Sequence, residues 1–307
     1  MSMGKYILQR LAFTVIVVFF VSVMVFVITN MIGNPVDIML PLTASAEQRA
    51  LLTSQLGLDR PIPERLGKFL GQAVTLDFGL SWWQRRPAME VVMDDLPLTA
   101  VLIFMAICIS TLTAIPLGIA AAYKKGSLLD RALTIFSLSG ICLPPFWIGL
   151  MLMLVFAVRL GWFPTSGAGT WRHMILPALA ISFRPMGQLA QIVRFEMSQQ
   201  LNALYVITAR AKGVTELAVL FKHSLKNIMT ASITMIGSDF TKQLGGLSAS
   251  VEVVFGFPGF GHMITETIKN MDFPLLQAGV FFVAIIVCLV NLLVDILYAA
   301  FDPRIRY

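Results

Sequence analysis

Four long runs without a charged side chain constrain this sequence more than any other feature. They cover residues 11–36, 96–123, 132–158 and 273–294, and they contain 26, 28, 27 and 22 residues. An α-helix needs about 20 apolar residues to cross a hydrocarbon core about 30 Å thick. Only 13% of all residues are charged, against roughly 25% in soluble domains. The runs therefore predict membrane-spanning helices, and the composition excludes a free soluble enzyme and a disordered chain.

Two further apolar stretches are interrupted by charge. Residues 173–193 contain Arg184, and residues 227–251 contain Asp239 and Lys242. Both are long enough to span. We therefore expect an all-α integral membrane protein with six transmembrane helices, at about residues 10–30, 97–123, 131–158, 173–193, 227–250 and 274–300.

The distribution of basic residues predicts the orientation of these helices. With the N-terminus inside, the inner segments hold twelve Lys and Arg residues and the short outer loops hold three. Positive charge is enriched in cytoplasmic loops, so both termini are predicted to be cytoplasmic. The same rule explains the net charge of +6 without nucleic acid. Three histidines and three cysteines are scattered without metal-ligand spacing, and we expect no metal site.

The predicted outer segment, residues 31–95, carries signals for amphipathic helices. Ser45 with Gln48 three residues later is typical of a capping box. Pro63 suits a first helical turn, and the residues after it follow a helical period: Leu66, Phe69, Leu70, Ala73 and Val74. Trp82 and Trp83 are expected to anchor at the headgroup level.

The one long inner loop, residues 194–226, predicts two helices joined by a glycine turn. Its second half has apolar residues at helical spacing: Leu217, Leu220, Phe221, Ser224, Leu225 and Ile228. Thr215 is expected to be the N-cap of this helix. Gly213 lies between the two halves, where a sharp reversal favours a positive φ. From the pattern alone, a plain amphipathic connector is an equal alternative to a functional loop.

The sequence of this loop resembles that of the coupling loop of ABC importer permeases. More narrowly, it resembles the coupling loop of the dipeptide, oligopeptide and nickel permease family. The matching runs are residues 205–213 (YVITARAKG) and 221–227 (FKHSLKN). One departure is Ile207, where that branch usually carries Arg. Further resemblances occur in order along the chain: residues 5–11, 56–61, 77–79 with Ser81 and 86–87, 245–246, 251–252, 257–261, 291–295 and 302–306.

The resemblance implies a type I importer permease fold and a division into three parts. These are residues 1–30 with the first transmembrane helix, a periplasmic segment 31–95, and a five-helix core 96–307 with the coupling loop 194–226. It also implies these ATPase-coupling residues: Tyr205, Thr208, Ala209, Arg210, Ala211, Lys212, Gly213, Glu216 and Leu225.

The implied partners are a second homologous permease subunit, forming a heterodimer, two ATP-binding cassette subunits, and a periplasmic or lipid-anchored substrate-binding protein. The implied place is the bacterial inner membrane. No cofactor is expected in this chain, because it has no phosphate-binding loop of the form GxxxxGK[ST]. ATP and Mg are then bound by the partner subunits, and the chain is not an enzyme.

Ionisable residues within spans are costly and usually face a bundle interior or water. Arg184, Asp239 and Lys242, with Glu252 near a span end, are therefore candidates for the substrate pathway. Asp239 and Lys242 lie three apart and can pair on one helix face. The alternative is an internal ion pair that packs the subunits.

Two other classes of protein remain open from sequence: an ion-gradient-driven secondary transporter and a membrane-embedded enzyme. Against the first, the two halves of the sequence show no convincing internal repeat. Against the second, no cluster of His or carboxylate residues lies on a shared helix face. Within the resembled family the cargo is expected to be a di- or oligopeptide, with nickel chelates, glutathione or opines as alternatives.

Overall fold

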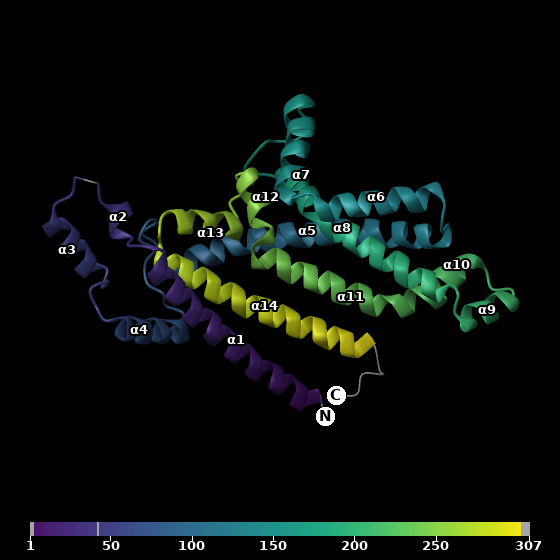
Figure 1. Ribbon diagram of the computed structural model, residues 1–307, viewed down its shortest axis with the longest axis horizontal. Helices are drawn as coiled ribbons and strands as arrows, with labels where there is room; N and C mark the ends of the chain where they lie inside the picture. Colours follow the sequence, from purple (N-terminus) through teal and green to yellow (C-terminus); the bar gives the residue numbers. More distant parts are fainter. Residues whose placement is uncertain (1–2, 42, 302–307) are drawn as a thin grey trace. The chain divides into compact units, whose positions relative to one another are not determined.

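The computed structural model describes the backbone of residues 3–41 and 43–301, and the side chains of residues 8–31, 33–41 and 43–296 within it. All regular structure in these residues is helical (Figure 1), and one isolated bridge joins Leu80 to Pro87. The all-α prediction is confirmed. The motif at residues 302–306 lies outside the described residues.

Three of the helical segments are π-helical: Met153–Arg159, Val219–Ser224 and Gln243–Leu247. The α-helices are α1 (Met3–Ile32), α2 (Val36–Met39), α3 (Ala46–Gln55), α4 (Ile62–Thr75), α5 (Ala88–Tyr123), α6 (Leu128–Cys142), α7 (Pro145–Leu152), α8 (Trp171–Gln200), α9 (Leu204–Ala211), α10 (Glu216–Ala218), α11 (Leu225–Lys242), α12 (Ala249–Val254), α13 (Phe260–Lys269) and α14 (Phe273–Phe301).

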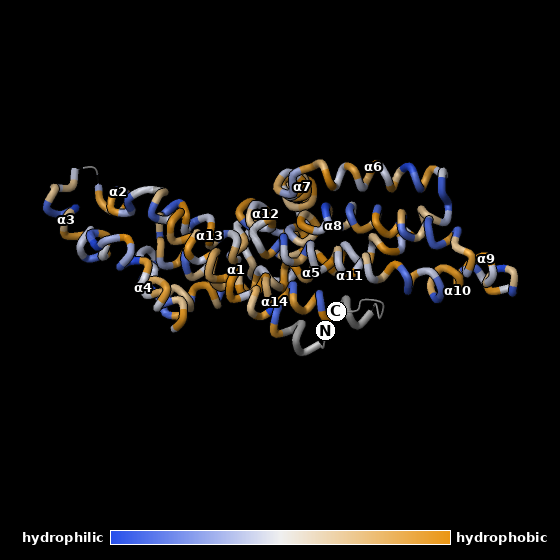
Figure 2. The backbone as a smooth tube through the Cα atoms, turned by 60° about the horizontal axis from the view of Figure 1, so that its bottom comes forward, coloured by the Kyte–Doolittle hydropathy of each residue, from blue (hydrophilic) through white to orange (hydrophobic). Residues whose placement is uncertain are grey.

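Three helices of the described residues are long and apolar enough to cross a membrane unbroken: Leu8–Met31 in α1, Ala88–Tyr123 in α5, and Phe273–Ile296 in α14. Figure 2 shows apolar residues along most of α1. The bent pair α6 and α7 supplies a fourth span if it counts as one. Helices α8 and α11 lie in the two interrupted stretches. Six spans and two cytoplasmic termini stay predictions.

The prediction of one helix over residues 131–158 is wrong, because the chain bends by 107° between α6 and α7. Leu143 is extended there, with ψ 135°, as expected for a residue before proline. Pro144 and Pro145 follow in succession, so two backbone N–H donors are missing together. Pro116 and Pro185 stand alone and lie inside the continuous helices α5 and α8.

The prediction of one helix over residues 227–250 is also wrong. Helix α11 ends at Lys242, and a π-helical segment follows before α12 begins at Ala249. Gly246 has φ +122°, a conformation that side chains with a Cβ rarely adopt. The glycine therefore interrupts the helix and lets α12 start in a new direction.

The chain divides into two compact units. One is formed by Ala100–Phe257 with the end of α14 from Val290 onward, and α8 is its central helix, packed on α6, α7 and α11. A Cβ on Gly187 would lie 2.7 Å from the Ser137 carbonyl oxygen, and one on Gly140 would lie 2.8 Å from that of Phe183. The two glycines thus allow α6 and α8 to pack with their backbones in close approach.

The other unit contains the residues up to Thr99 together with Pro258–Leu289. The capping box of α3 is confirmed, with the Gln48 N–H 3.2 Å from Ser45 Oγ and the Ser45 N–H 3.0 Å from Gln48 Oε1. The helix after Pro63 is confirmed as α4, and it buries Phe69 and Ala73. Val74, which was predicted on the same stripe, is 86% exposed. It lies at the edge of that stripe, next to the buried Ala73. The division by membrane side stays a prediction.

Candidate functional site

The inner loop forms a compact helical hairpin, as predicted. Helix α9 ends in a turn at Gly213, whose φ is +79°. The Gly213 N–H donates to the Arg210 carbonyl at 2.9 Å, and the Val214 N–H donates to that of Ala209 at 3.2 Å. This pair of bonds is the Schellman motif, which satisfies the last carbonyls of a helix when a glycine follows in the left-handed region. The chain direction at the turn is therefore fixed by the backbone itself.

An ion pair closes the hairpin across that turn. Arg210 Nε lies 2.8 Å from Glu216 Oε1, and a second guanidinium nitrogen lies 3.1 Å from Glu216 Oε2. This two-point geometry is the strong form of the contact between Arg and a carboxylate. The hydrogen bond and the negative charge of Glu216 raise the pKa of Arg210. Two of the predicted coupling residues thus bind each other, and they join α9 to α10.

Tyr205 ties the hairpin to the helices on either side of it. Its hydroxyl donates to Gln200 Oε1 at 2.7 Å and accepts from Asn227 Nδ2 at 3.0 Å. Beside it, Val206 is fully buried, and α9 packs against the π-helical segment Val219–Ser224. The hairpin is consequently anchored to α8, to α11 and to the core.

The predicted stripe in the second half of the loop is confirmed for Leu220, Ser224 and Ile228, which are buried. It is wrong for Leu217 and Phe221, which are 69% and 51% exposed. The π-helical segment in between uses i→i+5 bonding. The wider turn shifts the positions that face the core, so a strict α-helical spacing fails there.

The tip of the hairpin presents apolar side chains to its surroundings. Leu204 is 82% exposed and Ile207 is 53% exposed, in addition to Leu217 and Phe221. The predicted coupling residues Thr208, Ala211 and Lys212 are also exposed, whereas Ala209 and Leu225 are half-buried. Thr215 precedes α10 with extended backbone, as an N-cap does, but its hydroxyl makes no capping bond. Several large apolar side chains exposed on one anchored element are typical of an interaction surface.

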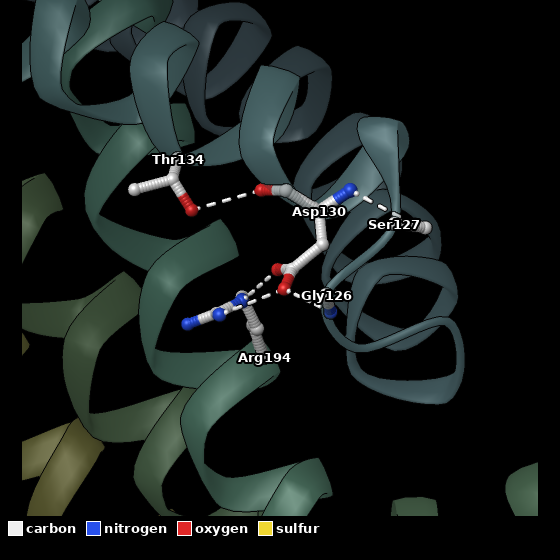
Figure 3. Close-up of polar contacts among 5 residues, drawn as sticks. All are labelled: Gly126, Ser127, Asp130, Thr134 and Arg194. Atoms are coloured by element: carbon white, nitrogen blue, oxygen red, sulfur yellow. Dashed lines mark hydrogen bonds and ion pairs between the residues drawn. The ribbon is translucent and has the colours of Figure 1, made fainter.

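One contact at the base of the hairpin is missing from the sequence predictions. The Asp130 carboxylate, in the first turn of α6, binds the guanidinium of Arg194 on α8 through two nitrogens, one of them at 3.1 Å (Figure 3). It also accepts the Gly126 N–H at 2.9 Å. Ser127 caps the helix by accepting the Asp130 N–H at 3.3 Å. The serine and the acid three residues later signal a helix start, but no sequence pattern names Arg194 as the partner.

The charged residues expected within spans fall into two groups. Asp239 of α11 is buried, and its carboxylate lies 3.9 Å from Lys242 Nζ. Arg184 of α8 is near enough to act electrostatically on the same carboxylate. Glu252 is fully buried on α12, where it accepts a hydrogen bond from Ser248 Oγ at 2.9 Å. The structure therefore brings Arg184, Asp239 and Lys242 together and places Glu252 beyond the helix break.

Comparison with known proteins identifies the class to which this arrangement belongs. Residues 114–307 match the family described as binding-protein-dependent transport system inner membrane component. The glutathione transport system permease proteins GsiC of Escherichia coli (strain K12) and of Shigella dysenteriae serotype 1 (strain Sd197) are each 37% identical over 306 residues. The alignment covers 99% of this chain and 100% of each relative.

The fold is similar to a chain of the MetNI methionine ABC transporter, solved in inward-facing conformations. The TM-score is 0.55 at 14% identity, over 70% of this chain and 97% of that one. The family match overturns the two alternatives of a secondary transporter and a membrane-embedded enzyme. This chain therefore belongs to the family of inner membrane components of binding-protein-dependent transport systems, and it is a multi-pass permease subunit of a bacterial ABC importer.

Proposed function

We propose that the hairpin at residues 194–226 receives the force of the ATPase, and that the importer carries short peptides, with glutathione among them. The observation that carries the first part is the Gly213 turn, held by the Schellman bonds and by the Arg210–Glu216 pair. A lever must be stiff, because a flexible linker would absorb the motion that it should transmit.

The exposed tip supports docking to another molecule. Leu204, Ile207, Leu217 and Phe221 leave large apolar surface uncovered at the end of an anchored element, and burial of such surface drives association. Lys212 and Lys222 add positive charge beside it. The hairpin thus inserts its apolar tip into a cleft of one ATP-binding cassette subunit, and a second permease subunit does the same with the other. ATP and Mg stay in those subunits.

The proposed substrate class is supported by the charges of the pathway residues and by the name of the relatives. Glutathione is a tripeptide with two carboxylates and an ammonium group, and GsiC is named for its transport. Arg184 and Lys242 offer charges that suit carboxylates, and Asp239 offers one that suits an ammonium. The proposed pathway, completed by Glu252, therefore fits a zwitterionic peptide. Nickel chelates and opines are the alternatives that the substrate test separates.

The lever is tested by straining its turn. In Gly213→Val, a β-branched residue must adopt φ +79°, which costs on the order of 1–2 kcal/mol and favours a rearranged turn. We expect the importer to assemble but to import less peptide per ATP hydrolysed. Gly213→Asn, which tolerates this region, should retain more coupling than Val.

Gly161→Val is the matched control. It imposes the same strain at φ +65° in an open loop far from the hairpin in sequence. The measurement is uptake and ATP hydrolysis in proteoliposomes containing all subunits and the binding protein, with assembly followed by size-exclusion chromatography. Wild-type coupling in Gly213→Val would refute the lever.

The substrate class is tested separately, by calorimetric titration of the binding protein and by uptake. Dipeptides, oligopeptides, glutathione, a nickel chelate and an opine are compared. We expect binding and uptake of peptides or glutathione. Binding confined to the chelate or the opine would refute the peptide class and leave the lever untouched.

A further inference from the structure

A cavity of about 440 Å³ opens in the unit that contains the outer segment. One wall is the polar edge of α4, with Arg65, Lys68 and Gln72, and the Arg60–Glu64 ion pair lies beside it. The other wall is aromatic. It contains Phe26, Phe69, Phe78, Trp82 and Phe273, of which Phe26 and Phe69 stack with ring centroids 5.7 Å apart.

Two of the five arginines of residues 31–95 have no ion pair among the described residues, Arg65 and Arg85, and of these only Arg65 is half-buried. Arg49, Arg60 and Arg86 each pair with a carboxylate, at 2.6, 2.9 and 2.7 Å. Arg65 is half-buried in the cavity wall, and within the described residues it has no ion pair or hydrogen bond from its guanidinium. Burial without a counter-charge lowers the pKa of Arg65. A partly desolvated cation without a partner destabilises the protein, and an anion in the cavity would offset this.

Lys68 adds a second positive charge to the same cavity. It follows Arg65 by three residues on α4, so both side chains lie on one helix face, and both line the cavity. Lys68 also makes no ion pair among the described residues. Two adjacent cations, one of them a planar guanidinium with several donors, suit a phosphate group.

The cavity lies at the end of two membrane-spanning helices. Phe26 belongs to the last turns of α1, and Phe273 and Gln277 belong to the first turns of α14. Gln277 Nε2 donates to Thr29 Oγ1 at 3.2 Å, so these two helix ends lie side by side. The end of a span is where lipid headgroups lie.

The same end of α1 also carries exposed apolar side chains, on a different face of the helix from Phe26. Met24, Val27, Ile28 and Met31 are exposed there, between 44% and 79%. Trp82 in the cavity wall is a residue type that favours the headgroup region. Both features are typical of the boundary between headgroups and hydrocarbon, which is where a phospholipid headgroup lies.

We propose that this cavity binds the phosphate of an anionic phospholipid headgroup through Arg65 and Lys68. The bound lipid would fix the ends of α1 and α14 to the outer segment that carries α4. The site shares no residue with the hairpin or with the charged residues of the proposed pathway, and the proposal does not depend on either.

The test measures phosphatidylglycerol binding to the complete, delipidated importer complex by native mass spectrometry and by thermal stabilisation. The variant is Arg65→Gln with Lys68→Gln, and the control is Arg85→Gln, an exposed arginine of the same segment that does not line the cavity. We expect at least about tenfold weaker apparent affinity in the double variant, about 1.4 kcal/mol, and wild-type affinity in the control.

The lipid-free protein provides an internal check. Removing an unpaired half-buried charge should leave the melting temperature of the lipid-free double variant no lower than that of the wild type. Equal phosphatidylglycerol binding by wild type and double variant would overturn the proposal. Equal stabilisation by inorganic phosphate at the same concentration, or by phosphatidylcholine, would overturn the assignment to an anionic lipid.

Discussion

Breaking the Asp130–Arg194 pair from its two sides should have unequal effects. The Asp130 side chain is 6% exposed and that of Arg194 is 32% exposed. In Arg194→Met, the carboxylate stays buried and keeps the hydrogen bond from the Gly126 N–H. In Asp130→Asn, the guanidinium can turn towards water, and the amide oxygen can still accept a hydrogen bond.

The magnitude follows from the exposure. A hydrogen bond to a charged group contributes about 1.5–3 kcal/mol, and solvent screening at the exposed third of Arg194 reduces the ion-pair part. We expect Arg194→Met to destabilise the protein by about 2 kcal/mol and Asp130→Asn by about 1 kcal/mol. At about 2–4 °C per kcal/mol for domains of 150–250 residues, the melting temperature falls by about 4–8 °C and about 2–4 °C.

The double variant gives the decisive result. With Asp130→Asn added, Arg194→Met no longer leaves a buried charge, so the double variant should be more stable than Arg194→Met alone. Arg131→Met, at the exposed neighbour of Asp130 on α6, is the control and should change little. The assay is thermal unfolding of the purified complex in detergent. Additive losses in the double variant would refute the reasoning, because independent sites add and coupled ones do not.

Three further outcomes are expected. Asp272 is buried and accepts three hydrogen bonds at the start of α14, so Asp272→Ala should destabilise by about 2 kcal/mol; an unchanged melting temperature would contradict this. A Cβ on Gly237 would lie 2.3 Å from Val294 Cγ2, so Gly237→Ala should reduce folded yield, and added Val294→Ala should restore it; no recovery would count against this contact. Asp239→Asn and Lys242→Met should each reduce uptake and leave assembly intact, and unchanged transport by both would dismiss their pathway role.

Local physics explains what could be predicted from the sequence. Charge-free runs demand helices in lipid, the Ser45–Gln48 pair closes its own capping box, and Gly213 adopts the left-handed turn of the hairpin. Each of these depends on residues within a few positions of one another. The sequence alone was therefore sufficient to predict the all-helical class, the hairpin, and the buried positions Leu220, Ser224 and Ile228 in its second half.

Contacts between distant segments were decided only by the tertiary structure. The break at Pro144–Pro145 has a local cause instead, because the pair removes two N–H donors at once, whereas Pro185 removes one and stays inside α8. The π-helical segment turns Phe221 outward. Asp130 pairs with Arg194, which lies 64 residues away in the sequence. The cavity at Arg65 is lined by residues of α1, α4 and α14. Hydropathy and helical period specify which face of a helix is apolar, but they do not specify which other helix that face meets, since many pairings bury the same area.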